Sequence, residues 1–440
     1  RIMKQTIIAI FLSTFLFAND QIPAAPQKHP ILLKNGFIHT VSNGVINGSI
    51  LFDKGKITHI GEFISPPDGA EVIDLDGKHV YPGFIAAVSR MGLVEISAVD
   101  VTNDHSERGD FNPNVRANVA YNPDSEIIPT TRSNGVLIAN VVPSSGLVSG
   151  QASIMMMDGW TWENATFSHP SGLHINWPQM GTRSGGRRFS MSAEKQNERR
   201  QKALKTLDEI MKQSHAYARL RQTKSRSAED YHMEDLRLEN MIPYVQGNLP
   251  IYIHANEVRQ IEAAVHWANR HDVKIVLVGG KDAWRTTDLL QKYKIPVIYE
   301  GVTALPSRRY EDYDQAYKGA ALLHEAGIQF CIASSSGDAS NVRNLPNHAA
   351  MAAAYGLPKD EALRSITLSA AEILGIDPQV GSLESGKDAT LFIANGDPLE
   401  IRTNVLQAYI QGRKIDMGDR HKMLYHKYQE KYRQLGILKQ

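Results

Sequence analysis

The chain has 440 residues, of which 42% are hydrophobic and 22% charged; this is ordinary globular composition and excludes disorder on a large scale. With a formal net charge of +1, nothing in the charge balance points to nucleic acid or to an acidic membrane surface as the main partner, and a nucleic-acid role would need a local patch. The single cysteine, Cys331, rules out an intramolecular disulfide, and its place in the apolar run FCIAS favours a small buried hydrophobic residue.

The N-terminus is typical of a secretory signal peptide. Lys4 lies just before the apolar run TIIAIFLSTFLFA, which ends at the small residue Ala18 and is too short for a comfortable membrane span. We therefore expect a signal peptide over residues 1–18 and a secreted, periplasmic location for the mature chain, without a stable membrane span.

Two distant segments have the same β-rich pattern. Residues 29–80 consist of short alternating runs broken by Asn-Gly and Lys-Gly turns, as in ILLKNGFIHTV and GSILFDKGKITHIG. The pattern returns over residues 381–417, in GSLESGKDATLFIANGDPLE and VLQAYIQGRKI. The two segments are predicted to pair as one small composite β-sandwich domain.

Residues 81–380, between these segments, contain eight short apolar runs: FIAAVS, VLIANVV, SIMMM, LHINW, IYIHA, KIVLVGG, PVIYEG and FCIASS. The later runs alternate with helical patterns, such as residues 257–271 and 360–374. Strands that are apolar on both faces and alternate with helices indicate a parallel sheet. Eight of them predict an α/β protein with a (β/α)₈ TIM-type barrel, whose chemistry lies at the C-terminal ends of the strands.

Two further segments are predicted to be helical. Residues 183–240 interrupt the barrel pattern with mixed charges and good helix formers, as in EKQNERRQKALKTLDEIMKQ. They indicate an exposed helical insertion, either a solvated flap or packing element or a basic docking element or lid. Residues 418–440 are expected to form a C-terminal helical tail.

Two histidines are candidates for chemistry because of their position on predicted strands. His254 closes the run IYIHAN at a strand end that would point into a barrel site. His174, in GLHINWP, could bind a divalent metal through a neutral imidazole nitrogen. The alternatives are a structural role for His254 and packing of His174 beside Trp177.

The acids and serines at other strand ends are further candidates. Asp338, in ASSSGDASNVRNLP after the last run, could be a general base or metal ligand, or it could cap a turn or helix. Ser334, Ser335 and Ser336 could form a hydrogen-bonding wall, and Glu300 is a weaker candidate at the end of the seventh run. A solvated loop is favoured for the polar residues after the first run, which are Glu95, Asp104, His105 and Glu107.

Other catalytic motifs have no support. GSLESGK fits the start of a phosphate-binding loop, but Asp388 replaces the required Ser or Thr and a strand follows. The sequence lacks G-x-S-x-G, H-E-x-x-H, C-x-x-C and G-x-G-x-x-G.

The chain resembles the amidohydrolase superfamily, in its imidazolonepropionase-like group, over nearly all of the mature sequence. The motifs that carry the resemblance are ILLKNGFIHTV, DLDGKHVYPGFI, GLVSGQASIM, IYIHAN, RNLPNHAAMAAAYGLPKDEALRSITLSAAEILGI and GSLESGKDATLFIANGDPLE. The resemblance implies a metal-bearing barrel with a composite β-sandwich, and hydrolysis of amide or other C–N bonds in cyclic amides or peptide-like compounds. In the family, a metal-bound hydroxide attacks the carbonyl while a strand-eight aspartate moves the proton.

Carried over residue by residue, the family's ligand positions are only partly kept. The His-x-His pair on strand one falls on Val88 and Arg90, and the strand-six histidine falls near Gly279. His174, His254 and Asp338 match the positions on strands four, five and eight, with Ser335 or Ser336 as the rival match on strand eight.

The remaining ligands imply one catalytic Zn²⁺ at His174, His254 and Asp338. Asp338 would then be the base, and Arg90 would bind a substrate carboxylate or stabilise an oxyanion. Glu300, Ser335 and Ser336 would complete substrate binding. The resulting prediction is a secreted hydrolase of C–N bonds with a reduced, mononuclear metal site and a small-molecule substrate. The alternative is an inactive relative that binds a small molecule or pairs with an active homologue, as a homo- or hetero-oligomer.

Overall fold

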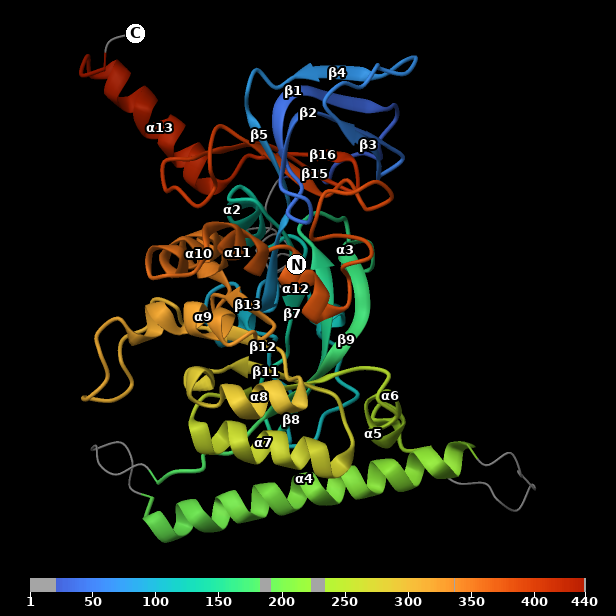
Figure 1. Cartoon of the computed structure of the whole chain (residues 1–440), viewed down its shortest axis with the longest axis vertical. Helices are drawn as coiled ribbons and strands as arrows, with labels where there is room; N and C mark the ends of the chain where they lie inside the picture. Colours follow the sequence, from blue (N-terminus) through green and yellow to red (C-terminus); the bar gives the residue numbers. More distant parts are fainter. Residues whose placement is uncertain (1–20, 183–190, 223–233, 336, 439–440) are drawn as a thin grey trace, which may run out of the picture.

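The computed structural model describes residues 21–182, 191–222, 234–335 and 337–438. It forms an eight-stranded barrel sheet, a second sheet above it, and helices that flank both (Figure 1). The predicted signal peptide, residues 1–18, lies outside the described residues. Within the described part of the chain, none of the helices combines the length and the apolar character needed to cross a membrane.

All eight apolar runs form neighbouring strands of one sheet, in chain order, and the last strand returns to contact the first. The strands are β6 (Phe84–Ser89), β7 (Val136–Val141), β8 (Val148–Met156), β9 (Thr166–Asn176), β10 (Ile251–Ala255), β11 (Ile275–Gly279), β12 (Val297–Glu300) and β13 (Phe330–Ala333). The prediction of an α/β barrel is therefore confirmed. The barrel interior is filled by apolar side chains from these strands; β9 contributes the partly buried Phe167 together with the buried, polar His174.

One strand differs from the (β/α)₈ pattern. β8 is antiparallel to both β7 and β9, whereas β9 to β13 pair in parallel. The connection from Val141 to Val148 is too short for a helical crossover, which needs a dozen or more residues. The expectation that all eight strands are parallel is wrong at β8, and residues 136–176 form a meander within the barrel wall.

The second sheet joins the two ends of the chain. Its strands are β1 (Ile31–His39), β2 (Val45–Asp53), β3 (Lys56–Gly61), β4 (Glu71–Asp74), β5 (His79–Pro82), β14 (Leu391–Ala394), β15 (Val405–Ile410) and β16 (Arg413–Ile415). The N-terminal β5 pairs with the C-terminal β14, in the register Val80 to Ile393. Hydrogen bonds join all eight strands in one sheet around a shared core, so the N- and C-terminal segments pair in a single sheet.

The two sheets meet where β5 continues into β6 through Pro82 and Gly83. Gly83 donates its amide hydrogen to Thr390 O at 3.0 Å. A Cβ at this position would lie 2.8 Å from a side-chain carbon of Leu137, so only glycine allows the two backbones to approach this closely. The Pro-Gly turn thus fixes the direction in which β6 enters the barrel.

Helices cover the barrel sheet on its outside. The longer ones are α2 (Ile127–Arg132), α7 (Val258–His271), α8 (Thr287–Tyr293), α9 (Gln315–Glu325), α10 (Leu345–Ala354), α11 (Lys359–Ser365) and α12 (Leu368–Leu374). Short helical turns are α3 (Trp162–Ala165), α5 (Leu236–Glu239), α6 (Ile242–Val245), η1 (Asp100–Thr102), η2 (Ala117–Ala120), η3 (Ala283–Arg285) and η4 (Ser340–Asn344).

The predicted helical insertion contains one long helix, α4 (Ala193–Gln222), which lies alongside α7 at the edge of the molecule (Figure 1). Asp208 on α4 accepts a hydrogen bond from the His271 ring at 2.8 Å, and Leu207 and Met211 are buried. The helix is therefore a packing element on this face. Residues 183–190 and 223–233 of the insertion lie outside the described residues.

The C-terminal tail forms α13 (Arg420–Gln434), which projects from the body beside the second sheet (Figure 1). None of its residues is buried.

Candidate functional site

The candidate site lies where β6, β9, β10, β12 and β13 end or approach their ends. His174 on β9 and His254 on β10 project toward each other, with Nδ1 of His174 2.8 Å from Nε2 of His254. One of these nitrogens donates and the other accepts, so the two rings share a proton between them. The structure thus brings together the two histidines that the sequence singled out.

Both histidines are held in the neutral form. His174 is fully buried, and burial, followed by the nearby His254, lowers its pKa well below 6.5. Burial, followed by the charge of Arg90, lowers the pKa of His254 to about 4. Neither ring is therefore protonated at neutral pH.

The His174 ring has a defined support. It stacks on the ring of Tyr252, with centroids 4.8 Å apart and planes 8° from parallel. Tyr252 is two residues before His254 on β10, so both side chains point to the same face of the sheet. Sequence reasoning missed Tyr252, although its two-residue spacing from His254 was a signal for it.

Arg90 follows directly after β6. Its amide donates to the carbonyl of Asp338 at 2.9 Å, which ties the end of β6 to the loop after β13. Burial lowers the pKa of the Arg90 guanidinium, and the charge of Glu300 opposes that shift. Its Nε is buried and has no hydrogen-bond partner among the described residues. Arg90 is therefore a fixed cation near His254 and Glu300.

The other ligand positions are closed by packing. Val88 is buried among the apolar side chains that fill the barrel. Gly279 has φ +97°, and a Cβ there would lie 2.6 Å from Oδ1 of Asn256. The Asn256 carboxamide thus occupies the space into which a strand-six ligand would project.

Asp338 caps a turn. Its Oδ1 accepts the amide hydrogen of Asn341 at 3.0 Å, at the start of η4. This is the capping alternative that the sequence left open. Burial lowers the pKa of His348, and the charge of Asp338 partly offsets that shift. His348 on α10 is a further polar residue at this edge that sequence reasoning missed.

The three serines after β13 differ in their roles. Ser335 closes the turn, because its Oγ accepts from the amide of Gly337 at 3.2 Å and its carbonyl accepts from Asp338 at 3.0 Å. Ser336 lies outside the described residues. Ser334 is buried, and its Oγ has no partner in the described part of the chain, so it is a better candidate for ligand contact than Ser335.

In the polar loop after β6, Asp104 and Glu107 are exposed, whereas Glu95 and His105 make side-chain contacts. Glu95 accepts hydrogen bonds from the Ser125 hydroxyl and from the amide of Glu126, and burial raises the pKa of its carboxyl. His105 Nδ1 lies 2.9 Å from Oγ of Ser144. These contacts hold the loop against the barrel wall.

The donor set does not fit a resident divalent metal. Among the residues that the structure describes, no three His, Cys, Asp or Glu side chains form a group that could hold a metal ion. The facing nitrogens of His174 and His254 are hydrogen-bonded to each other, and the carboxylate of Asp338 is engaged by Asn341. The expected ligand set of His174, His254 and Asp338 is therefore not brought together.

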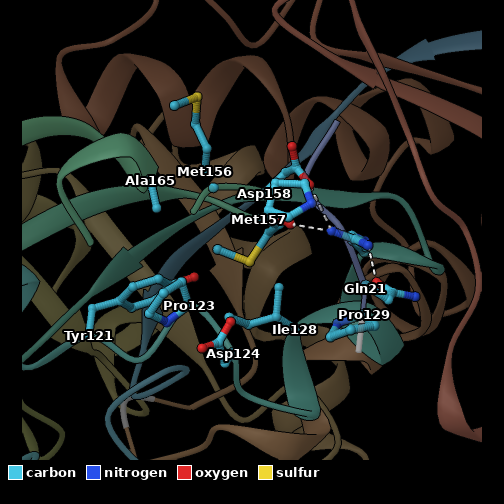
Figure 2. Close-up of a pocket in the computed structure, with 13 residues that line it drawn as sticks. Gln21, Tyr121, Pro123, Asp124, Ile128, Pro129, Met156, Met157, Asp158 and Ala165 are labelled. Carbon is cyan, nitrogen blue, oxygen red and sulfur yellow. Dashed lines mark hydrogen bonds and ion pairs between the residues drawn. The ribbon is translucent and has the colours of Figure 1, made fainter. Parts of the chain in front are cut away.

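A separate cavity lies between α2, β8 and α3 (Figure 2). Its volume is about 20 Å³, which is room for about one water molecule. Met156, Met157 and Tyr121 form part of its lining. It is too small for a substrate and is part of the packing of this region.

A buried ion pair borders this cavity. Asp158 Oδ1 accepts from Arg132 at 3.2 Å and Oδ2 accepts from Arg413 at 2.8 Å. Gln21 also accepts a hydrogen bond from Arg132, and the Ala24 amide donates to Asp158 at 3.2 Å. Because Arg132 is on α2 and Arg413 on β16, Asp158 joins the barrel, the second sheet and the N-terminal segment.

Comparisons with known proteins agree with the fold. Residues 248–417 match the model of the amidohydrolase family. The crystal structure of an amidohydrolase from Thermotoga maritima MSB8 superposes with a TM-score of 0.77 and 25% sequence identity, covering 88% of this chain and 99% of that one.

Two curated relatives are similar in sequence. Amidohydrolase tasK from Hapsidospora irregularis is 22% identical over 400 residues, which cover 83% of this chain and 39% of that protein. An adenine deaminase from Kosmotoga olearia is 31% identical over 151 residues, which cover 32% of this chain. The chain thus spans 39% and 26% of the lengths of these relatives.

Proposed function

Since this chain belongs to the amidohydrolase superfamily, we propose that it hydrolyses a C–N bond in a small molecule whose carboxylate is bound by Arg90 at the barrel mouth. The observation that carries this proposal is the half-buried Arg90 at the end of β6, whose Nε is buried and lacks a partner among the described residues. A buried cation is stabilised by an anion, and the planar guanidinium suits a carboxylate.

The neighbouring side chains support a bound amide next to that carboxylate. His254 is partly open at the barrel mouth and neutral, so its imidazole can accept or donate a hydrogen bond. Ser334 adds a hydroxyl without a partner in the described chain. Arg90 would also stabilise negative charge that develops on a carbonyl oxygen when water attacks it.

Hydrolysis at this site would depend on few groups. Water would add to the carbonyl carbon and lose a proton to His254, and the C–N bond would then break as the amine takes up a proton. Superfamily members usually use a divalent metal, but the described donor set does not fit one, so the expected zinc has no part in these steps.

A turnover screen tests this proposal. Purified protein is incubated with N-acyl amino acids and carboxylate-bearing cyclic amides, and with the matching carboxamides, and products are measured by mass spectrometry. We expect cleavage of carboxylate compounds only, and unchanged rates after dialysis against a chelator. Cleavage that is lost on chelation and restored by zinc would show that a metal does the chemistry. If carboxamides were cleaved as fast as the matching carboxylates, Arg90 would not bind the substrate through a carboxylate.

A second candidate function is binding without turnover, and the histidine pair favours it. A ring whose pKa is about 4 is a weak base at neutral pH, and the positive charge of Arg90 opposes its protonation. Carboxylate ligands would then bind with no product formed. Screening the same compounds by calorimetry separates the two functions, because binding with no cleavage supports only the second.

Secretion and assembly remain proposals. Export depends on the sequence of residues 1–18 alone. A homo- or hetero-oligomer is proposed without a specific contact surface, and nucleic acid has no support in the near-neutral charge of the chain.

A further inference from the structure

The C-terminal helix α13 is a surface element that contacts the rest of the protein near its first turn, where Nδ1 of His421 lies 3.3 Å from the Arg343 guanidinium. All its residues are at least partly exposed, and Figure 1 shows it projecting from the body. Asp419 caps its first turn by accepting from the amides of His421 and Lys422, at 2.8 and 3.0 Å. A helix of 15 residues is only marginally stable in water without tertiary packing. An exposed helix of this length therefore suggests a partner.

One face of α13 carries apolar and aromatic side chains. Leu424, Tyr428, Tyr432 and Leu435 follow each other at intervals of four, four and three residues, and Tyr425 adjoins them, so they share a face. The exposed fractions run from 37% for Leu424 to 64% for Tyr425. This face is the surface that a partner would cover.

Basic side chains flank that face on both sides. At about 100° per residue, Lys427 and Lys431 lie along one margin, and Lys422 and Arg433 lie along the other. The helix has five basic residues and one acidic residue, Glu430, which gives a net charge of +4 with neutral histidines. The whole chain is only +1, so the rest of the protein is net negative. The positive charge is concentrated on this helix.

From this arrangement we propose that α13 binds the surface of a membrane that contains anionic phospholipids. Tyrosines and leucines would enter the headgroup region while the flanking lysines and arginines contact the phosphates. A second copy of this chain fits less well, because pairing two such faces would bring together two helices of charge +4. The helix would lie on the membrane and leave the barrel mouth in water.

Sedimentation with lipid vesicles tests the proposal on the full chain. One set of vesicles contains phosphatidylcholine alone, and the other contains phosphatidylcholine with phosphatidylglycerol. We expect binding to the anionic vesicles that weakens with added salt, and no binding to the neutral ones. Equal binding to both sets, or no binding to either at low salt, would overturn the proposal.

Paired variants locate the contact. Lys427→Glu with Lys431→Glu should weaken binding at least about tenfold, and Tyr428→Ser with Tyr432→Ser should also weaken it without a change in charge. The matched control, Lys202→Glu with Lys205→Glu on the exposed face of α4, should bind as the unmodified chain does. Because no α13 residue is buried, these variants are expected to fold. If the tyrosine variant changes the sedimentation coefficient without affecting vesicle binding, the helix pairs with a second copy and the proposal fails.

Discussion

Replacing Asp158 by alanine is expected to lower the free energy of unfolding by about 3–5 kcal/mol, because it leaves the buried Arg132 and the partly buried Arg413 without their ion-pair partner. The Asp158 side chain is only 2% exposed, and Arg132 is 5% exposed. Burial raises the pKa of the Asp158 carboxyl, and Arg413 and Arg132 oppose that shift. Asp158 is thus the one acid that forms an ion pair with both arginines in the described structure, and the charge of Asp416 also acts on Arg132.

Chemical denaturation of the purified protein measures this effect. Glu209→Ala is the matched control, because it removes one partner of the exposed Lys205–Glu209 pair and should change stability by less than about 0.5 kcal/mol. A loss below about 1 kcal/mol for Asp158→Ala would mean that solvent reaches the two arginines.

Acid is expected to destabilise the protein between about pH 6.5 and pH 4. The pKa values of His39, His169 and His254 are lowered from 6.5 to about 4, in each case mainly by burial, and burial also lowers the pKa of His174 well below 6.5. In the unfolded chain these rings take up protons near pH 6.5, and in the folded chain they do so only near pH 4. Their contribution to stability is therefore complete above pH 6.5 and is lost as the pH falls toward 4.

The size of this effect follows from linkage. Each ring that binds a proton only in the unfolded state makes the free energy of unfolding fall by about 1.4 kcal/mol per pH unit, and partial exposure reduces that value. The raised pKa values of Asp158 and Glu95 work in the opposite direction at lower pH. The loss from the histidines as a set is expected to be several kcal/mol by pH 4.

Unfolding midpoints measured across this range test the prediction. His169→Asn removes one half-buried ring, whose Nδ1 lies 2.8 Å from Oγ of Ser153, and should reduce the slope against pH. His29→Asn, at a side chain that is 49% exposed, should leave the slope unchanged. A stability that is flat from pH 7 to pH 4 would contradict the burial of these imidazoles.

The fold could be predicted from the sequence because its signals are local. Eight apolar runs became eight neighbouring strands, and the Asn-Gly and Lys-Gly turns marked the composite β domain. The direction of β8 was also readable in principle, since the six residues between Val141 and Val148 cannot hold a helical crossover. The expectation that β8 is parallel to β7 did not take the shortness of this connection into account.

The candidate site was predicted only in part, because its properties depend on contacts between distant segments. His174 and His254 were identified from their strand positions, but their direct hydrogen bond depends on the register of β9 and β10. The capping role of Asp338 and the turn role of Ser335 depend on backbone amides that no residue pattern identifies. The steric block by Asn256 at Gly279 is likewise visible only in three dimensions.

A calorimetric titration tests the assignment of Arg90 most directly. An N-acyl amino acid and its carboxamide are titrated into the unmodified protein, into Arg90→Met, and into the control Arg108→Met at an exposed site on the same loop. We expect the unmodified protein and the control to prefer the carboxylate by at least about tenfold, and Arg90→Met to lose that preference. A preference for the carboxylate that survives in Arg90→Met would place the anion elsewhere and contradict the role of Arg90.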